Sequence, residues 1–214
     1  MSELLLASRS PRRTRILEAA GIPFRLGPAP DVDESLPPGL APAAAARALA
    51  ERKARAVVGR VPGELVLCAD TLVVLPGGDL PGDDLPGDDL QGGEVLGKPR
   101  DAADAVRMLT RLSGRTHEVA TGVAVARDAR LESGVDVARV TFRSLGSAEI
   151  EAYVRTGEPL DKAGAYAIQG GARAFVARLE GAQDTVIGLP VALVGDLLRR
   201  MRQAGLGSEG AAGR

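Results

Sequence analysis

An apolar stretch with a carboxylate at its centre constrains the fold of this chain more than any other feature. Residues 65–75 read LVLCADTLVVL, so Asp70 and Thr71 interrupt a segment that is otherwise apolar. The segment is short and rich in β-branched residues, which predicts a strand buried on both faces rather than a surface helix. Burying an ionised carboxylate without partners costs several kcal/mol. Asp70 must therefore be paired, bind a metal cation, or lie where the strand emerges into a cleft, and a purely structural ion pair is an open alternative.

Composition indicates a globular chain with a core of its own. The 214 residues are 45% hydrophobic and 26% charged, which is enough to bury a large core without disulfides or structural metals. Cys68 is the single cysteine, so an internal disulfide and a cysteine-rich metal site are excluded. Its apolar neighbours predict a small core residue, and a catalytic thiol is the less favoured alternative.

Charge and aromatic content argue against a nucleic-acid-binding module. The formal net charge is -1 at pH 7, and the chain has three phenylalanines, two tyrosines and no tryptophan for base stacking. A local basic cluster that binds a small polyanion is compatible with this balance.

No stretch is apolar enough to span a membrane, and the apolar run at residues 4–7 precedes the first basic residues, the reverse of a secretory signal. We therefore expect a cytoplasmic protein without a membrane or nucleic-acid partner.

A serine- and arginine-rich turn follows the first predicted strand. Residues 3–8 predict a short strand, and residues 14–20 carry helical spacing. Between them, the sequence SRSPRR, which begins at Ser8, places two serines, three arginines and free backbone N–H groups at a helix N-terminus, where anions are favoured. We interpret this turn as a phosphate cradle in which Arg12 and Arg13 contact phosphate, and a solvated basic turn is the alternative.

A lysine on the apolar face of the next helix indicates the same chemistry. Residues 42–58 predict an alanine-rich helix in which Lys53 shares the apolar stripe. Such a lysine either extends to solvent or faces an anion, and the buried Asp70 favours an anion. Glu34, in the acidic loop at residues 31–35, could face Asp70 and hold a divalent cation with it, although acidic clusters on loops are usually only solvated.

A tandem pentapeptide separates the central strand from the strand that returns beside it. Residues 76–95 read PGGDL, PGDDL, PGDDL and QGGEV, a composition that predicts an exposed hairpin tip without a catalytic role. The strand resumes at residues 94–96 and leads to Lys98.

His117 lacks an accompanying serine nucleophile motif, so a positional or hydrogen-bonding role is favoured over that of a base. A helix is predicted at residues 101–112, followed by two paired strands at residues 119–126 and 135–142.

The last third of the chain contains a small-residue segment that ends in a glutamine. Residues 158–171 read EPLDKAGAYAIQGG, with Lys162 near the start and Gln169 between an isoleucine and two glycines. A glutamine amide offers a donor and an acceptor side by side, which matches the imide edge of uracil or thymine, and a surface glutamine in a glycine turn is equally open. A helix with Ser147 as its N-cap is predicted before this segment, at residues 147–156. A strand at residues 175–179, a closing helix at 190–204 and a disordered tail at 205–214 are predicted after it.

Six motifs occur in a fixed order along the chain. They are LASRSPRR at 6–13, ADT at 69–71, GKP at 97–99, LSGRTH at 112–117, DKAGAYAIQG at 161–170 and IGLP at 187–190. Together they resemble the Maf family of nucleoside triphosphate pyrophosphatases, in particular the branch that acts on dTTP and UTP. The resemblance covers residues 4–200. Arg9, where a small residue is usual, and AQDT at 182–185 depart from the family pattern.

The resemblance implies the fold and the roles of particular residues. It implies an α/β protein with an inosine triphosphatase-like fold, a mixed central sheet and two lobes around a nucleotide cleft, in a single domain over residues 1–204. Asp70 would be the catalytic proton acceptor, and Arg12, Thr71 and Gln169 would set pyrimidine specificity. The triphosphate path would be lined by Arg13, Lys53, Lys98 and Lys162, next to Ser8.

The resemblance also implies the reaction and its requirements. Asp70 and a divalent cation such as Mg²⁺ or Mn²⁺, for which Glu34 is the second candidate ligand, would activate water for hydrolysis between the α and β phosphates. The products would be a monophosphate and pyrophosphate, so the reaction would remove non-standard or excess nucleotides. Members of the family are often homodimers. The alternatives are a pyrophosphatase for modified purine nucleotides and a nucleotide-binding regulator of cell division without relevant turnover.

Overall fold

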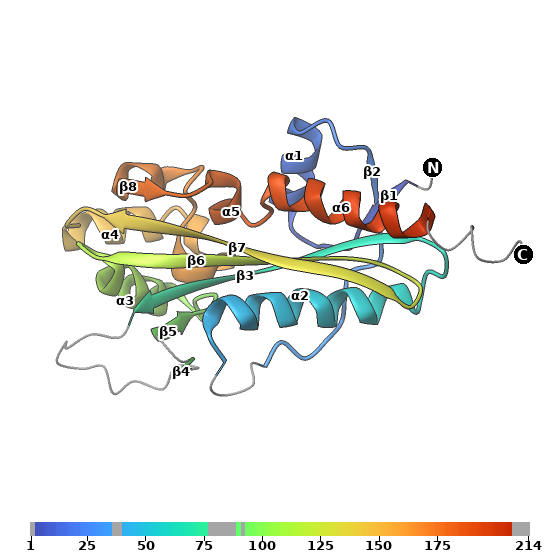
Figure 1. Ribbon diagram of the computed structural model, residues 1–214. Coiled ribbons are helices and arrows are strands. Elements are labelled where there is room, and N and C mark those ends of the chain that lie inside the picture. The colour runs from blue at the N-terminus through green and yellow to red at the C-terminus, as the bar shows by residue number, and fades with distance from the viewer. Residues whose placement is uncertain (1–2, 36–39, 77–88, 91–92, 207–214) are drawn as a thin grey trace, which may run out of the picture.

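The computed structural model describes residues 3–35, 40–76, 89–90 and 93–206 of the chain (Figure 1). The strands are β1 (Leu4–Leu6), β2 (Phe24–Leu26), β3 (Leu65–Pro76), β4 (Asp89–Leu90), β5 (Gly93–Leu96), β6 (Thr116–Arg127), β7 (Arg130–Phe142) and β8 (Val176–Glu180). The α-helices are α1 (Pro11–Ala19), α2 (Pro42–Val58), α3 (Ala102–Leu112), α4 (Ser147–Val154), α5 (Gln183–Ile187) and α6 (Val191–Leu206). Three 3₁₀ segments follow α4, namely η1 (Glu158–Asp161), η2 (Ala163–Ala165) and η3 (Gly171–Phe175).

All the strands belong to one mixed sheet. Its order is β2-β1-β3-β6-β7-β8, with β5 also paired to β3 and β4 paired to β5. β1 runs parallel to β2 and β3, and the other pairs are antiparallel. The α/β class and the mixed central sheet expected from the sequence are confirmed.

One edge of β3 is shared by two partners and has a gap between them. β6 covers the opposite edge from Val66 to Val74, so β1 and β5 both use the remaining edge. β1 pairs there with Leu65–Leu67, and β5 pairs with Val73–Pro76. Residues 68–72 lie between these partners, and Asp70 is at the middle of the gap. Strand ends where neighbouring connections diverge are the usual ligand sites of α/β sheets, so the topology favours a site here.

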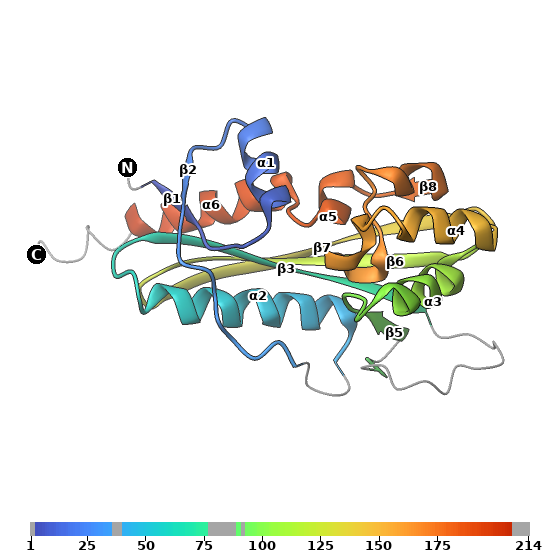
Figure 2. The same cartoon turned by 180° about the vertical axis from the view of Figure 1, so that it is seen from behind.

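Side chains of β3 alternate between the two faces of the sheet. Cys68 packs with apolar residues of α2, whereas Ala69 packs with those of α1 and α6. Figures 1 and 2 show α2 along one face of the sheet, with α1 and α6 over the other. Asp70 therefore points toward α2, and Thr71 points toward the opposite face.

The face opposite α2 carries two separate apolar clusters, which form the two lobes. Ala69 belongs to the cluster built with α1 and α6, and Val73 belongs to the cluster built with α3 and α4. These helix pairs lie at opposite ends of the sheet in Figures 1 and 2. The expected two-lobed arrangement is confirmed, and Thr71 lies at the boundary between the lobes.

A glycine allows α2 to approach the middle of the sheet. A Cβ at Gly122 of β6 would lie 2.2 Å from the backbone oxygen of Ala46 in α2, so only glycine fits there. α2 begins with Pro42 and buries Ala46, Ala50 and other small side chains against the sheet. This close contact fixes the position of α2, and with it the position of Lys53 beside the gap in β3.

Several element boundaries differ from the predicted ones. The helix expected from the spacing at residues 14–20 begins at Pro11, because proline is preorganised for the first helical position and has no N–H to satisfy. The prediction that Ser147 caps α4 is wrong: Gly146 has the extended N-cap conformation, and Ser147 is already the first helical residue. Residues 24–26, for which no strand was predicted, form β2 because the edge of β1 is open to them.

The repeat and the tail fall largely beyond the described residues. β3 and β5 form the antiparallel pair expected on either side of the repeat, but residues 77–88 and 91–92 are not described. α6 continues to Leu206, two residues past the predicted end of the closing helix at residue 204, and residues 207–214 are not described. In the described part of the chain, no helix has the length and apolarity needed to cross a membrane.

Candidate functional site

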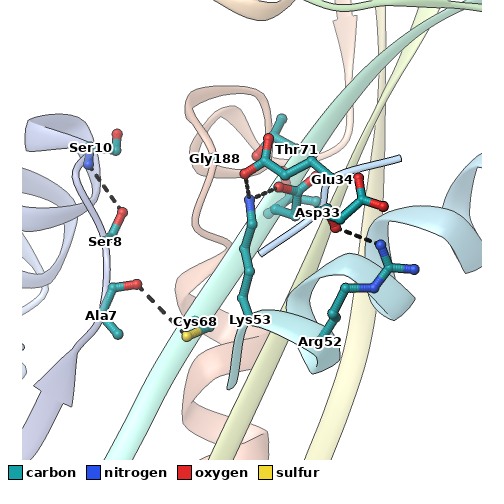
Figure 3. Close-up of polar contacts among 12 residues, drawn as sticks. Ala7, Ser8, Ser10, Asp33, Glu34, Arg52, Lys53, Cys68, Thr71 and Gly188 are labelled. Atoms are coloured by element: carbon teal, nitrogen blue, oxygen red, sulfur yellow. Dashed lines mark hydrogen bonds and ion pairs between the residues drawn. The ribbon is translucent and has the colours of Figure 1, made fainter. Parts of the chain in front are cut away.

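A lysine shared by two carboxylates lies at the gap in β3. Lys53 Nζ donates hydrogen bonds to Asp70 Oδ1 and to Glu34 Oε1, the latter at 2.6 Å (Figure 3). Lys53 and Asp70 are 7% and 8% exposed, so the pair is buried. The prediction that Lys53 faces an anion is confirmed, and the charge of Asp70 is compensated. A purely structural role of Asp70 would also require a buried ion pair, so the pair alone does not distinguish a structural role from a functional one. The neighbouring groups decide what the site can bind.

The loop that carries Glu34 is anchored on α2. Arg52 Nη1 donates to the backbone oxygens of Asp33, at 2.6 Å, and Ser35, at 3.0 Å. The Asp33 side chain accepts from the Ser35 N–H at 2.8 Å, which closes a tight turn. Figure 3 shows the contact between Arg52 and Asp33. Arg52 and Lys53 are consecutive residues of α2, so one turn of helix positions both the loop and the ammonium group that Glu34 contacts.

Electrostatics keep Glu34 ionised despite its contact with the protein. Burial acts to raise the pKa of Glu34, but the hydrogen bond and charge of Lys53, with the charges of Lys98 and Arg13, outweigh it and lower the pKa. The field of Lys98 and Arg13 therefore reaches the carboxylates at the gap. Lys98 is exposed just after β5, as expected for a residue that can reach a ligand.

Arg13 approaches the same gap from α1, on the other face of the sheet. It donates from Nε to the Gly188 carbonyl at 2.9 Å, from Nη1 to Ser8 Oγ at 3.3 Å and from Nη2 to Thr71 Oγ1 at 3.5 Å. Among the described residues, no carboxylate lies within ion-pair distance of Arg13. Desolvation lowers the pKa of Arg13, against the effect of Asp70, yet a guanidinium stays charged. Arg13 is thus a half-buried cation held by neutral groups, which favours an incoming anion.

The turn before α1 has the features of an anion cradle. Ser8 Oγ accepts from the Ser10 N–H at 3.1 Å and from Arg13, which shapes the turn (Figure 3). Ser10 is the N-cap of α1, and its side chain makes no capping hydrogen bond. The first N–H groups of the helix thus lack a side-chain cap, as anion-binding helix ends do.

Two other predicted cations share a carboxylate that the sequence analysis did not single out. Arg12 Nη1 lies 3.7 Å from Asp161 Oδ2, and Lys162 Nζ donates to Asp161 Oδ1 and to the backbone oxygen of Glu158. Arg12 belongs to the α1 lobe and Asp161 to the lobe of α3 and α4. The pair therefore joins the two lobes beside the gap, and its side chains are exposed enough to exchange partners.

Gln169 is exposed on a turn that other residues hold in place. Tyr153 Oη accepts from the Ala167 N–H at 3.0 Å, and the Glu158 carboxylate accepts from the Gly171 N–H at 3.0 Å. These two bonds lie on either side of Gln169. The structure describes no contact between Gln169 and the residues around Asp70, so its role in base recognition stays a prediction.

His117 and Cys68 belong to the core rather than to the site. His117 is fully buried, with Nε2 2.9 Å from Tyr166 Oη, and burial lowers the pKa of His117 to about 3. Burial raises the pKa of Cys68 to about 12, and its Sγ lies 3.7 Å from the Ala7 oxygen (Figure 3). The expected hydrogen-bonding role of His117 and core role of Cys68 are confirmed.

Two acidic side chains lie close together at the gap. Within the described ranges, no group of three or more histidine, cysteine, aspartate and glutamate side chains could hold a metal ion. Asp70 and Glu34 nevertheless converge on one Lys53 Nζ, so two hard oxygen donors lie close together. Mg²⁺ commonly takes one or two carboxylates and completes its shell with phosphate oxygens and water, and this pair fits that mode.

Three residues near the site were missed by the sequence analysis. Thr121 and Thr185 are buried: the Thr121 hydroxyl bonds to the Thr71 hydroxyl and donates to the backbone oxygen of Thr185. The backbone oxygen of Gly188 accepts from Arg13. Thr121 had a signal, since it is a polar residue inside an apolar strand, as Asp70 is. Gly188 was quoted within a motif but given no role, and its φ of 118° shows why glycine is required there.

The fold and this group of residues define a class of protein. It is an α/β protein with a mixed, two-lobed sheet in which a buried carboxylate and its lysine lie at a gap between strands. An arginine with no carboxylate at ion-pair distance in the described part of the chain lies at the same gap, and such a cation favours an anionic ligand. The chain belongs to the Maf-like protein family, whose family model matches residues 3–201.

Curated relatives cover nearly the whole chain. A dTTP/UTP pyrophosphatase from Moorella thermoacetica is 51% identical over 92% of this chain and 94% of its own length. A dTTP/UTP pyrophosphatase from an Anaeromyxobacter species is 50% identical over 92% of this chain and 88% of its own length. Another from Pelotomaculum thermopropionicum is 46% identical over 94% of this chain and 97% of its own length.

A solved structure gives a weaker match. The nucleoside-triphosphatase / dITP/XTP pyrophosphatase from Mycobacterium abscessus is 18% identical, with a TM-score of 0.35 over 65% of this chain and 74% of that chain. At this TM-score, the likeness says nothing further about the architecture of this chain.

Proposed function

We propose that this protein is a nucleoside triphosphate pyrophosphatase that hydrolyses dTTP and UTP to the monophosphate and pyrophosphate. The observation that carries the proposal is the meeting of Asp70, Lys53 and Arg13 at the gap in β3, with the basic turn of α1 beside it. This combination offers a carboxylate for proton transfer and cations for a polyphosphate. The names of the relatives that share half of their residues with this chain support the choice of substrate.

In this mechanism, Asp70 accepts the proton of the attacking water. Lys53 holds the Asp70 carboxylate in place and neutralises its buried charge in the resting site. Arg13 and the N–H groups of α1 bind the phosphates and stabilise the charge that develops on the departing pyrophosphate. When bound by Asp70 and Glu34 together with the phosphates, a divalent cation such as Mg²⁺ or Mn²⁺ would supply charge neutralisation and a more acidic water.

The more peripheral residues serve recognition in this proposal. Arg12, Lys98 and Lys162 contact the triphosphate, and Arg12 and Lys162 release Asp161 to do so. Thr71 and Gln169 select the pyrimidine, with the Gln169 amide matching the imide edge of the base. Location in the cytoplasm and assembly as a homodimer complete the proposal, and light scattering on the purified protein tests the assembly.

The decisive experiment assays the purified protein against a full panel of nucleoside triphosphates with Mg²⁺ or Mn²⁺. We expect pyrophosphate release, fastest with dTTP and UTP, and loss of activity in Asp70→Asn. Release of orthophosphate, or full activity in Asp70→Asn, would contradict the proposal. A preference for modified purine nucleotides would favour the first alternative, and tight nucleotide binding without turnover would favour a regulator.

A second variant tests base recognition separately from chemistry. Gln169→Glu replaces the amide donor by an acceptor, so it should lose the preference for dTTP and UTP. The measurement is kcat/KM for dTTP and for a purine triphosphate in parallel. An unchanged ratio would show that Gln169 does not contact the base.

A further inference from the structure

A chain of hydrogen bonds leads from α5 through the sheet to Arg13. Thr121 Oγ1 donates to the backbone oxygen of Thr185 at 2.7 Å. Thr71 Oγ1 lies 3.0 Å from Thr121 Oγ1, its direct neighbour across the β3–β6 pair. Arg13 Nη2 lies at the end of the chain, 3.5 Å from Thr71 Oγ1. Thr121 and Thr185 are completely buried, so water does not compete for these groups.

Proton counting fixes the direction of every bond in this chain. A threonine hydroxyl has one proton to donate. Thr121 gives its proton to the Thr185 carbonyl, which has none to return, so Thr71 must be the donor in the bond between the two hydroxyls. The remaining lone pairs of Thr71 can then only accept. Thr71 is thus compelled to face Arg13 as an acceptor, and its single proton is not available to a phosphate oxygen.

Helix α5 anchors both ends of the arrangement. The Thr185 hydroxyl donates to Asp136 Oδ2 of β7, which holds the carbonyl that Thr121 needs. Three residues later, the Gly188 carbonyl accepts from Arg13 Nε at 2.9 Å. A Cβ at Gly188 would lie 3.0 Å from Thr71 Oγ1, so this glycine also leaves room for the contact. One short helix therefore orients Arg13 directly and, through Thr121 and Thr71, indirectly.

We propose that Thr121 is a positioning residue that fixes the Thr71 proton and thereby holds the Arg13 guanidinium ready for a polyphosphate. Every acceptor that Arg13 itself contacts is neutral, so Arg13 is oriented without having its charge compensated by a carboxylate. Without the Thr121 hydroxyl, the Thr71 proton loses its fixed acceptor, so the Thr71 hydroxyl is free to rotate and its lone pairs are no longer held toward Arg13. The polyphosphate as ligand rests on the proposed function, whereas the direction of the hydrogen bonds rests on geometry alone.

The test measures binding of inorganic tripolyphosphate by titration calorimetry. Thr121→Val keeps the β-branched shape but removes the hydroxyl, and Thr121→Ser keeps the hydroxyl. We expect Thr121→Val to weaken binding about tenfold, the effect of losing one hydrogen bond to a charged group, and Thr121→Ser to bind within about twofold of the wild type. The matched control is Thr116→Val, on the same strand, whose hydroxyl is 2.8 Å from that of Thr141 but exposed and away from Arg13. It should bind like the wild type.

Two further variants separate positioning from general damage to the fold. Thr71→Val removes, at a half-buried position, the hydroxyl that accepts from Arg13, so it tests the chain of hydrogen bonds even where Thr121→Val fails to fold. The double variant should bind no more weakly than either single one, because both act through Arg13. In nucleotide kinetics, KM should rise more than kcat falls, since Arg13 already binds the phosphates before the reaction.

The outcomes distinguish this inference from the proposed function. Wild-type affinity in Thr121→Val and Thr71→Val, or no recovery in Thr121→Ser, would overturn it. Weakened tripolyphosphate binding in these variants supports it even if the wild type hydrolyses no nucleotide, and in that case only the proposed function fails.

Discussion

Replacing Lys53 with methionine should destabilise the protein more than removing its partner Asp70. The Lys53 and Asp70 side chains are 9% and 11% exposed, so the variant leaves a buried carboxylate without its counter-ion. Methionine fills the volume of the lysine stem, so the effect is electrostatic rather than a cavity. Breaking a buried pair by removing one partner costs about 3–5 kcal/mol, and we expect a loss of that size. Asp70→Asn should cost about 1–2 kcal/mol, because Lys53 keeps Glu34 at 2.6 Å.

The assay is equilibrium unfolding in guanidinium chloride at neutral pH, followed by circular dichroism. Lys53→Met with Asp70→Asn should recover more than about 1 kcal/mol relative to Lys53→Met alone, because the buried Asp70 charge is then gone and the Glu34 carboxylate that also loses its lysine is 65% exposed. Arg55→Met is the control, since Arg55 lies on the same helix in an exposed pair with Glu51 at 3.4 Å, and it should change stability by less than about 0.5 kcal/mol. A Lys53→Met variant as stable as the wild type, or a larger loss in Asp70→Asn, would refute the reasoning.

Three further predictions follow from buried groups. The pKa of His117 is lowered to about 3, so below about pH 6.5 the unfolded chain takes up a proton that the native state does not, and stability falls by up to about 1.4 kcal/mol per pH unit until about pH 3. His117→Gln should remove this loss in denaturant titrations at several pH values, and equal slopes would contradict it. Gly122→Ala should cost about 3 kcal/mol because its Cβ meets the backbone of α2, whereas Gly59→Ala, with nothing within 4 Å, should not; melting temperatures of both decide the point. Cys68, with a pKa raised to about 12, should resist a thiol reagent at pH 8 until denaturant is added, and fast labelling of the native protein would show that the strand is accessible.

Local sequence signals predicted the long elements of the fold well. α2 spans the predicted residues 42–58, because a proline at its start, an apolar stripe and a following glycine all mark it. β3 extends one residue past the predicted end at Leu75, because a continuous apolar run of this length has few alternatives. α5 and the 3₁₀ segments were not predicted, since five residues or fewer carry too little periodicity.

Local sequence patterns were enough to identify the side chains that are costly to bury. A carboxylate in an apolar strand, a lysine on an apolar helix face and arginines after Ser-Pro each violate a local pattern, so Asp70, Lys53 and Arg13 could be named without a structure. Such a violation shows that a partner must exist. It does not show which residue the partner is.

Tertiary structure decided the partners and the directions of the side chains. Lys53 and Asp70 are 17 residues apart, and Arg13 is 175 residues from the Gly188 carbonyl that holds it. Asp70 and Thr71 are consecutive, yet the pleat of β3 sends them to opposite faces, and only the gap between β1 and β5 lets groups from both faces meet. Strand pairing between distant segments sets this geometry, and no local pattern in the chain encodes it.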